Sequence, residues 1–562
     1  MRFSHQLLGG TAFATLLGLG ASFGMGWSTL QQDLEMAGVM GIDPETVFAD
    51  RAGFKAAMKH HAEKSGAPEA EFTESNWHVY RFLSTMRTPM PSTRIASGLT
   101  IPSTNPEARS SCLMAARPML TRYADFYLVN ETSFFVQLLE EFHGMGIVWE
   151  HRYYGESNPF PVNLDTPAEH FQYLNNEQAL ADIPYFAKNF KRENFPDDDL
   201  TPKSTPWVMI GGSYPGMRAA FTRDQYPETI FASFAACAPV QAQVDMSVYY
   251  EQVYRGLVAY GYGNCTKDVR AAYKYMDSKL RRGESAAEIK KLFLGDTAQN
   301  NTNGDFTQAL IWTWATWQSQ GPDGGVGQFC NWLETDPKTN KTAPAEGWAP
   351  TKGAKAVVER FAAWPGLVPR VNAAFETNCK GENPDEPTMC NLGKRVADPS
   401  GIAWTWQYCS EWGYFQYQNW PPHEILSDFQ TDRYIQTSLC YRQFPDGLKS
   451  GYLPRRPKAR QTNKATGGWH MRPSNTYWSG GQYDPWRSLS PLSQEWFAPK
   501  VDIITEIPEC NKPTSPREIF GYIVPNAQHC YDFRSYFEAG EKSRQLWRAA
   551  LHKWLPCFKK QE

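Results

Sequence analysis

The sequence predicts an α/β fold: a mostly parallel β-sheet with helices on both faces, and a helical domain inserted into it. Strand-like and helix-like segments alternate from Cys112 to about Gln241, which is typical of βαβ units. The alternation then stops, and strand-like segments return only after a long stretch that is mostly helical and rich in aromatic residues. We therefore predict a sheet domain of residues 112–240 and 445–562, and a helical cap domain of residues 241–444.

The expected elements follow from the hydrophobic periodicity of each segment. Residues 27–111 show no clear periodicity and form a divergent N-terminal region to which we assign no structure. The elements expected after it are strands over 123–129, 146–150, 207–210, 231–240, 475–481 and 517–525, and helices over 132–143, 177–194 with a bend at Pro184, 217–226 and 533–555.

The composition supports a large buried core and does not indicate a nucleic-acid partner. Of the 562 residues, 41% are hydrophobic and 20% are charged, with 20 Trp, 27 Tyr and 32 Phe, so apolar side chains are ample. The formal net charge is -3 at pH 7, and the sequence contains no basic cluster. Because nucleic-acid binding needs a positively charged surface, we expect no such partner.

Residues 1–26 have the pattern of a secretory signal peptide. Arg2 supplies positive charge, no charged residue occurs from Leu7 to Met25, and small residues nearby offer cleavage sites. An uncleaved signal anchor is the alternative, because the apolar stretch approaches the roughly 20 residues that span a bilayer. We expect cleavage and secretion, with no membrane contact afterwards, and a vacuolar or lysosomal lumen as the alternative location.

Cysteines and glycosylation sequons also bear on whether the protein is secreted. Six of the 11 cysteines fall between Cys265 and Cys440 without the short paired spacings of a zinc site, so we expect disulfides formed in an oxidising compartment. The odd total leaves at least one cysteine unpaired or bridged to another chain. Sequons mark four candidate glycosylation sites: Asn130, Asn264, Asn300 and Asn340.

Three residues that could act as nucleophile, acid and base each follow a predicted strand. Ser213 lies in "GGSYPG" after the apolar "WVMI", Asp484 follows "TYWSGGQY", and His529 follows "REIFGYIVPNAQ". A serine hydroxyl needs a base to take its proton and a third group to orient that base. Hydrolases of this architecture carry the three groups in the order serine, acid, histidine, and the gap between Ser213 and Asp484 would hold the cap.

Each of these residues also has a purely structural interpretation. Glycine-rich turns that contain serine are common, Asp-Pro pairs usually form turns, and a single histidine is usually structural. The match to G-x-S-x-G is imperfect, because Pro215 stands where the pattern has glycine. What favours the catalytic hypothesis is the joint occurrence of three candidates, in the required order, at the ends of three predicted strands.

Four blocks of sequence resemble one known family. They are "VWEHRYYGESNPF", "PWVMIGGSYPGMRAAF", "SGGQYDPWR" and "VPNAQHCYD". Together they resemble the serine carboxypeptidase family that includes lysosomal Pro-Xaa carboxypeptidase, dipeptidyl peptidase II and thymus-specific serine protease. The runs "GNCTKDV", "WTWQYCSEWGYFQYQ" and "GGWHM" are similar to the secreted fungal acid prolyl endoproteases of that family.

The resemblance implies an α/β-hydrolase fold with a helical cap, and hydrolysis of peptide bonds on the carboxyl side of proline. It implies Ser213 as nucleophile, Asp484 as orienting acid and His529 as base. The backbone N–H of Tyr214 is the expected first oxyanion donor, because it follows the nucleophile. Met217 and Trp486 match positions near the proline pocket of relatives, although buried Met and Trp are more often plain core.

The family's activity at acid pH raises a physical question about the base. A histidine with an ordinary pKa near 6.5 would be mostly protonated at pH 4 to 5. A protonated imidazole cannot accept the proton of the serine hydroxyl. A local feature would therefore have to compensate.

The N-terminal part departs from the family. Relatives carry a glycine-containing loop that helps to form the oxyanion hole, whereas the corresponding stretch from Leu113 to Tyr123 contains no glycine. Either the protein diverged there, or part of residues 27–111 reflects a mistaken exon boundary.

The functional hypotheses follow from these matches and departures. A secreted proline-specific serine peptidase, in endopeptidase, carboxypeptidase or dipeptidyl-peptidase mode, is the first. Its partners would be proline-containing peptides or proteins. A catalytically impaired secreted glycoprotein that uses the fold as a binding module is the alternative, and an esterase or lipase is the third. No H-E-x-x-H metal motif or nucleotide-binding glycine motif occurs, so we expect no cofactor and no metal.

Overall fold

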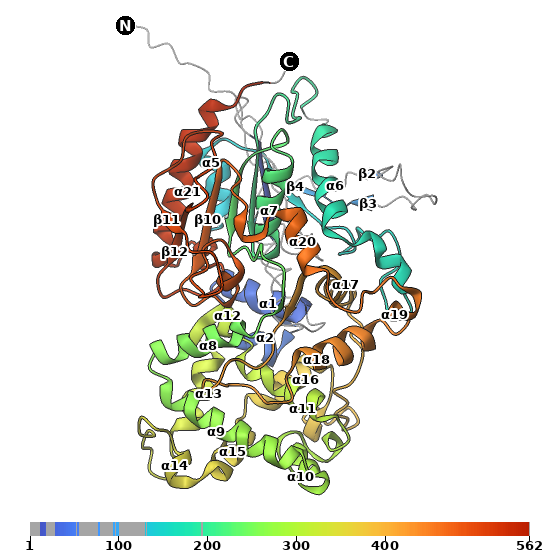
Figure 1. Ribbon diagram of the computed structural model, residues 1–562, viewed down its shortest axis with the longest axis vertical. Coiled ribbons are helices and arrows are strands. Elements are labelled where there is room, and N and C mark those ends of the chain that lie inside the picture. Colours follow the sequence, from blue (N-terminus) through green and yellow to red (C-terminus); the bar gives the residue numbers. More distant parts are fainter. Residues whose placement is uncertain are drawn as a thin grey trace.

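A computed structural model gives the arrangement of most of the chain (Figure 1). It describes residues 12–17, 28–51, 53–54, 77–78, 94–95, 97–100, 127, 130, 132–192 and 195–560. The strand expected over 123–129 and the loop from Leu113 to Tyr123 lie almost entirely outside these residues. Among the described residues, no helix is both long and apolar enough to cross a membrane.

The centre of the fold is an eight-stranded sheet with the order β11-β12-β10-β7-β6-β1-β5-β4. All neighbouring strands run parallel except the edge pair β4 and β5, which is antiparallel. The strands are β11 (Asp502–Ile504), β12 (Glu518–Val524), β10 (Thr476–Gly481), β7 (Ile230–Ala236), β6 (Trp207–Gly212), β1 (Ala12–Leu17), β5 (Gly146–Trp149) and β4 (Ser97–Thr100). The predicted mostly parallel sheet is confirmed.

The central strands are buried along their whole length. Every residue of β6, β7 and β10 is buried, which explains why their sequences are continuous apolar or small-residue runs without alternation. The register aligns Gly212 of β6 with Ala236 of β7, and Ala236 with Ser479 of β10. The carboxyl ends of these strands therefore meet at one edge of the sheet, where loops carry functional residues in folds of this kind.

Helices pack on the sheet as the alternating pattern predicts. Helix α7 (Tyr214–Gln225) follows β6 and packs on β1, β6 and β7, and α6 (Asn176–Lys188) packs against α7. Helix α21 (Glu541–Trp554) packs on β7, β10 and β12. Helix α5 (Phe134–Glu141) joins it through Glu141, whose carboxylate pairs with Arg548 and His552. This is an α/β-hydrolase fold.

The terminal helix begins later than the expected residue 533. Residues 531–540 form two short 3₁₀ turns, Tyr531–Phe533 and Glu538–Gly540, before α21 starts. The guanidinium of Arg544 donates hydrogen bonds to the carbonyls of Asp532, Arg534 and Phe537. The carbonyls of Arg534 and Phe537 also accept from the N–H groups of Phe537 and Gly540, three residues further on, which is the spacing of 3₁₀ turns and not that of a continuous α-helix.

Between β7 and β10 the chain contributes no strand to the main sheet. Its helices are α8 (Val248–Ala259), α9 (Gly263–Leu280), α10 (Gly283–Leu294), α11 (Asn303–Leu310), α12 (Trp317–Gln320), α13 (Gly325–Glu334), α14 (Ala349–Lys352), α15 (Ala354–Ala362), α16 (Leu367–Phe375), α17 (Pro399–Gln407), α18 (Asp432–Tyr434), α19 (Gly447–Ser450) and α20 (Ala459–Thr466). Most of them form the lower part of the molecule in Figure 1. The boundaries 241–444 for a cap domain stay a prediction.

Three disulfides lie within this helical part of the chain. They join Cys265 to Cys330, Cys379 to Cys390, and Cys409 to Cys440. These are the six cysteines between Cys265 and Cys440 for which the sequence predicts disulfides. The expectation of disulfides is confirmed.

The N-terminal region contains two helices that the sequence pattern did not indicate. Helix α1 (Ser28–Val39) packs against α12 and α17, and α2 (Glu45–Ala49) packs against α16. Both therefore contact the helical part of the chain. Glu35 of α1 is buried there and accepts a hydrogen bond from Gln318.

Strand β1 lies within the predicted signal peptide. It pairs with β6 from Ala12 opposite Trp207 to Leu17 opposite Gly212, and with β5 at Thr15. A chain that loses residues 1–26 loses this strand, so cleavage of the leader and an eight-stranded sheet exclude one another. The signal peptide stays a prediction.

Candidate active site

Ser213 occupies a sharp turn between β6 and α7. Its φ is 66° and its ψ is -129°, a region that residues other than glycine rarely adopt and that costs of order 1–3 kcal/mol. The Ser213 N–H donates to the carbonyl of Ala236 at 2.8 Å, and its own carbonyl accepts from the N–H of Met217 at 3.0 Å. This backbone conformation is that of a nucleophile elbow, which presents the serine hydroxyl at the end of a strand.

The residues around Ser213 explain how the imperfect motif is tolerated. Pro215 lies in the first turn of α7, where a backbone N–H has no partner within the helix and its absence costs little. A Cβ on Gly216 would stand 2.5 Å from the carbonyl oxygen of Ala236 and 2.9 Å from that of Gly211. Glycine at 216 is therefore required for the close approach of α7 to the sheet.

Asp484 and His529 form a buried pair. The Nδ1 of His529 lies 2.9 Å from each carboxylate oxygen of Asp484, and the two side chains are 1% and 0% exposed. An ionised carboxylate can only accept, so Nδ1 carries the proton and donates it. Asp484 also accepts from the N–H of Trp486 at 2.9 Å, which fixes the carboxylate at the start of the following 3₁₀ turn.

The other imidazole nitrogen of His529 is open. Its Nε2 is buried and, within the part of the chain that the structure describes, has no hydrogen-bond partner. The structure records no hydrogen bond between Ser213 and His529, although both lie at the same edge of the sheet. The loops of the three predicted triad residues are thus gathered at this edge, the acid and base are bonded, and the serine is not yet bonded to the base.

Two neighbouring groups, Asp484 and Cys530, affect the protonation of His529. Burial lowers the pKa of the imidazole, but the Asp484 carboxylate and, after it, Cys530 outweigh burial and raise this pKa well above its usual value. The raised pKa favours imidazolium, the species that forms when the histidine takes a proton from serine.

Gln318, in α12, anchors the acid and base loops. Its backbone carbonyl accepts from the N–H of His529 at 3.2 Å. Its side-chain Oε1 accepts from the indole N–H of Trp486 at 2.9 Å and from the hydroxyl of Tyr249 at 3.1 Å. Gln318 is fully buried. One residue from the helical part of the chain therefore holds both loops of the acid–base pair.

Tyr214 is anchored through its hydroxyl by a chain of hydrogen bonds. Gln407 donates to this hydroxyl at 2.7 Å, and the hydroxyl lies 3.0 Å from Nε2 of His151. His151 Nδ1 lies 2.6 Å from the carbonyl of Arg152, which can only accept. His151 therefore carries its proton on Nδ1 and accepts from Tyr214 through Nε2. The predicted oxyanion donor, the Tyr214 N–H, begins α7, where backbone N–H groups lie outside the helix ladder.

The block "EHRYYGES" has a structural role in this region. The carboxylate of Glu150 accepts from the hydroxyl of Ser157 at 2.7 Å and from the N–H groups of Glu156 and Ser157 at 3.0 Å. Burial raises the pKa of Glu150 to about 7 in spite of these bonds. A Cβ on Gly155, whose φ is 56°, would stand 1.7 Å from Glu150 Oε1, so only glycine fits there.

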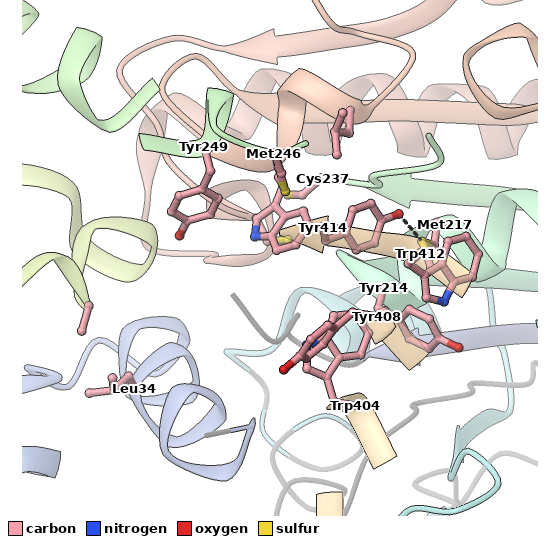
Figure 2. Close-up of a cluster of buried hydrophobic side chains, with 14 of the residues drawn as sticks. Leu34, Tyr214, Met217, Cys237, Met246, Tyr249, Trp404, Tyr408, Trp412 and Tyr414 are labelled. Atoms are coloured by element: carbon pink, nitrogen blue, oxygen red, sulfur yellow. Dashed lines mark hydrogen bonds between the residues drawn. The ribbon is translucent and has the colours of Figure 1, made fainter. Parts of the chain in front are cut away.

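The predicted pocket residues Met217 and Trp486 are joined by a third aromatic residue, Tyr414. The hydroxyl of Tyr414 lies 3.8 Å from Met217 Sδ, as Figure 2 shows, and 2.5 Å from the carbonyl of Pro239. The rings of Tyr414 and Trp486 meet edge to face with centroids 5.2 Å apart. Met217 and Trp486 are both buried. Their assignment to a substrate pocket stays a prediction.

The four sequons differ in exposure. Asn300 and Asn340 are exposed, whereas Asn130 and Asn264 are half-buried. Asn130 Oδ1 also accepts from the hydroxyl and the N–H of Thr132. Glycosylation of all four stays a prediction.

Sequence reasoning missed four residues that hold the predicted site residues in place. Gln318, Gln407, His151 and Tyr414 come from three separate segments of the chain. No motif marks Gln318, and nothing in its local sequence indicates that it reaches the loops of Asp484 and His529. His151 lies inside the quoted block "EHRYYGES", and Gln407 and Tyr414 lie inside the quoted run "WTWQYCSEWGYFQYQ", so these blocks could have indicated that all three lie near the site.

Comparison with known proteins agrees with the resemblance. A family model described as "Serine carboxypeptidase S28" matches residues 124–507. The chain is 29% identical over 316 residues to a probable extracellular serine carboxypeptidase of Arthroderma benhamiae, a match that covers 51% of this chain and only 42% of that protein. It is 26% identical to thymus-specific serine protease of Mus musculus, covering 74% and 75% of the two chains. It is 22% identical to lysosomal Pro-X carboxypeptidase of Bos taurus, covering 77% and 79%.

Solved structures were compared in the same way. The structure of proline iminopeptidase from Mycobacterium smegmatis aligns with 82% of this chain and 97% of its own, at 10% identity and a TM-score of 0.30. Similarity at this level does not bear on activity. The family match covers more than half of the chain, and we conclude that this protein belongs to the serine carboxypeptidase S28 family.

Proposed function

We propose that this protein is a secreted serine-type peptidase that cleaves peptide bonds on the carboxyl side of proline through an acyl-enzyme. The observation that carries the proposal is the bonded pair Asp484–His529, with Nε2 of His529 open, at the sheet edge where Ser213 occupies a nucleophile elbow. Membership of the serine carboxypeptidase S28 family supports peptide substrates.

The first half of the proposed reaction forms the acyl-enzyme. Ser213 Oγ attacks the carbonyl carbon of the scissile bond while His529 Nε2 takes the hydroxyl proton. The negative charge that develops on the carbonyl oxygen is stabilised by the Tyr214 N–H. The imidazolium then gives its proton to the leaving amine and the C–N bond breaks. Asp484 holds the imidazole in the required tautomer throughout.

The second half releases the acid product. A water molecule attacks the ester carbon and gives its proton to His529 Nε2. The imidazolium returns this proton to Ser213 Oγ as the ester bond breaks. The cycle leaves the protein unchanged and needs no further reactant.

Proline specificity would come from the apolar side chains next to the elbow. The ring of proline is flat and rigid, and an aromatic slot suits it. Met217 in the first turn of α7 and Trp486 in the turn after Asp484 both contact Tyr414. We propose that these three residues line the site for the proline side chain. The similarity to fungal endoproteases favours internal cleavage over trimming.

Activity at acid pH is the part of the expectation that the structure supports least. Asp484 raises the pKa of His529, and burial is the influence that lowers it. In the free protein the imidazole is therefore protonated at acid pH and cannot act as a base. Activity at pH 4 to 5 would require substrate binding to reverse this balance.

The test is cleavage of a set of proline-containing peptides from pH 4 to pH 8 by protein made through a secretory pathway. Products that end in proline are expected, and their lengths distinguish internal cleavage from removal of residues at either end. The Ser213→Ala variant should lose about 10⁶-fold in turnover, and Ser278→Ala, at an exposed serine of α9, should not. Cleavage retained by Ser213→Ala would refute the assignment of the nucleophile.

One observation favours the binding-module alternative. Ser213 and His529 are each 2% exposed and are not bonded to each other. If the folded protein cleaves none of the peptides but binds them, this alternative replaces the peptidase.

A further inference from the structure

Two buried thiols lie beside His529. The sulfur atoms of Cys237 and Cys530 and a ring nitrogen of His529 all lie within 4.8 Å of one another. Neither cysteine is in a disulfide. The three residues are at most 2% exposed. This group of two sulfurs and one imidazole is not used by the proposed peptidase reaction except through the histidine.

The backbone places both thiols against the nucleophile elbow. Cys237 directly follows β7, and its N–H donates to the carbonyl of Ser479 at 2.7 Å. Cys530 directly follows His529, and its sulfur lies 3.0 Å from the position that a Cβ would take on Gly212. Both cysteines have positive φ, 51° and 53°. The two thiols come from different strands and converge because those strands end at the same edge of the sheet.

The histidine is oriented as a metal ligand would be. Its Nδ1 donates to Asp484, and its Nε2 is buried without a hydrogen-bond partner among the described residues. Zinc-binding histidines usually donate their second nitrogen to a carboxylate in this way, which fixes the tautomer and leaves the other lone pair for the metal. His529 thus combines a buried ring nitrogen without a partner with two thiols close to its ring, and the unpartnered nitrogen is an independent sign of a ligand site.

The donor set is suited to a soft divalent cation. Two thiolates and one imidazole suit Zn²⁺ and Cd²⁺, whereas Mg²⁺ and Ca²⁺ prefer oxygen. Zn²⁺ binds sulfur at about 2.3 Å and nitrogen at about 2.0–2.1 Å in a tetrahedron, so its ligand atoms lie roughly 3.5–3.8 Å apart. Ligand atoms within 4.8 Å of one another reach this spacing by small side-chain movements.

We propose that Cys237, Cys530 and His529 form a binding site for Zn²⁺ or a similar thiophilic cation, and that the bound cation inhibits the enzyme. Binding forms two metal–sulfur bonds and one metal–nitrogen bond, releases two thiol protons, and leaves a fourth position for water. The bound metal occupies Nε2, which then cannot take the proton of Ser213. The inhibition, unlike the binding, rests on the proposed peptidase function.

Cd²⁺ is the probe for binding, because its ligation by thiolates produces an ultraviolet charge-transfer absorption that can be measured without an activity assay. The full-length protein should bind one equivalent of Cd²⁺ at this site, and Cys237→Ala and Cys530→Ala should each weaken binding by about tenfold or more. Cys510 and Cys557 are a second pair of free thiols, so Cys510→Ala is the matched control and should leave the site signal unchanged. His529→Gln should weaken binding while keeping both thiols.

Thermal unfolding of each variant without metal checks that it is folded. Absence of a thiolate–Cd²⁺ signal that depends on Cys237, in protein whose thiols are free by chemical counting, overturns the proposal. So does a covalent disulfide between Cys237 and Cys530 in the secreted protein.

The inhibition is then measured by a peptidase assay with added Zn²⁺, repeated after a chelator has been added. Inhibition that the chelator reverses and that Cys237→Ala abolishes supports the proposal. Cd²⁺ binding in a protein without peptidase activity would refute the proposed function and leave the metal site standing.

Discussion

The nucleophile half and the acid–base half of the site are held in different ways. Ser213 is fixed by the backbone of its own turn, through bonds to the carbonyl of Ala236 and from the N–H of Met217. Asp484 and His529 lie on loops that a residue of another segment, Gln318, ties together. The elbow therefore depends on β6, α7 and the adjacent strand β7, whereas the position of the base depends on contacts with the helical part of the chain.

Substitutions that affect these two halves of the site should therefore have different effects. Changes in the helical part of the chain should move the base and its acid while leaving the strained serine turn intact. Changes around Tyr214 should affect stability more than chemistry, because the predicted oxyanion donor is a backbone N–H that any side chain at this position supplies. The predictions below test this separation, starting with the largest expected effect.

Replacing the acid should disable the base half while the elbow remains. In Asp484→Asn, the amide presents a donor where Nδ1 of His529 needs an acceptor, and the imidazole adopts the wrong tautomer. We expect a loss of about 10⁴-fold in kcat, measured with a proline-containing peptide. Asp502→Asn, at an exposed position of β11, is the control. A kcat within tenfold of the wild type would show that Asp484 is not the orienting acid.

Removing the Gln318 side chain should allow the loops of Asp484 and His529 to move, although Gln318 itself belongs to neither loop. Gln318→Ala deletes the acceptor for the indole of Trp486 and the hydroxyl of Tyr249, so the Asp484 loop loses an anchor. Misplacement of a catalytic group by about 1 Å can cost about 100-fold, and we expect a loss of this order in kcat with little change in KM.

The control for this variant is its neighbour in α12. Gln320→Ala removes a partly exposed side chain whose amide donates to Asp43, and it should leave kcat unchanged. A rise in KM as large as the fall in kcat for Gln318→Ala would argue against a positioning role. So would equal effects of Gln318→Ala and Gln320→Ala on kcat.

The pH profile reports the protonation of the base half alone. The Asp484 carboxylate raises the pKa of His529, and the base must be neutral, so kcat/KM should fall by about tenfold for each pH unit below that raised pKa. The midpoint of the acid limb should lie above pH 6.5. An optimum at pH 4 to 5 would show that another feature of the site overcomes the charge of Asp484.

The smallest effect on chemistry is expected from the anchor of the nucleophile half. Tyr214→Phe removes a hydroxyl that bonds to His151 and Gln407 and leaves two buried polar groups without this partner. The free energy of unfolding should fall by about 1–3 kcal/mol, measured by denaturant titration, while kcat changes by less than tenfold. Tyr226→Phe, at the half-buried end of the same helix, is the control. A fall in kcat of more than tenfold with little change in the free energy of unfolding would place the hydroxyl in the reaction.

Sequence reasoning could predict the parts of the fold that depend on local sequence patterns. The apolar runs before Ser213, Asp484 and His529 correspond to β6, β10 and β12, and parallel pairing brings their carboxyl ends to one edge. The helical stretch after Gln241 and its six cysteines also follow from composition and spacing. The strands are predicted by short apolar runs, whereas the disulfides are predicted by the number and spacing of the cysteines over a longer segment.

The rest depends on contacts between distant segments. Gln318 reaches the catalytic loops only through the packing of α12, and no residue near it marks this role. Strand β1 pairs with β6 from within a segment that has the pattern of a signal peptide, because an uncharged apolar run suits both a leader and a buried strand. Helix α1 has two buried carboxylates, Asp33 and Glu35, which obscure its apolar face in the sequence.

The three disulfides make the two parts of the molecule respond differently to the redox state of the compartment in which the chain folds. They close loops between cysteines 65, 11 and 31 residues apart, and each such bridge is typically worth 2–4 kcal/mol by restricting the unfolded chain. No disulfide among the described residues joins the strands of the sheet. In a reducing host, the helical part of the chain would therefore lose this stabilisation, whereas the sheet, which holds none of the three disulfides, would not. Because Gln318 lies in that helical part, the choice of expression host decides whether the base is held beside the serine.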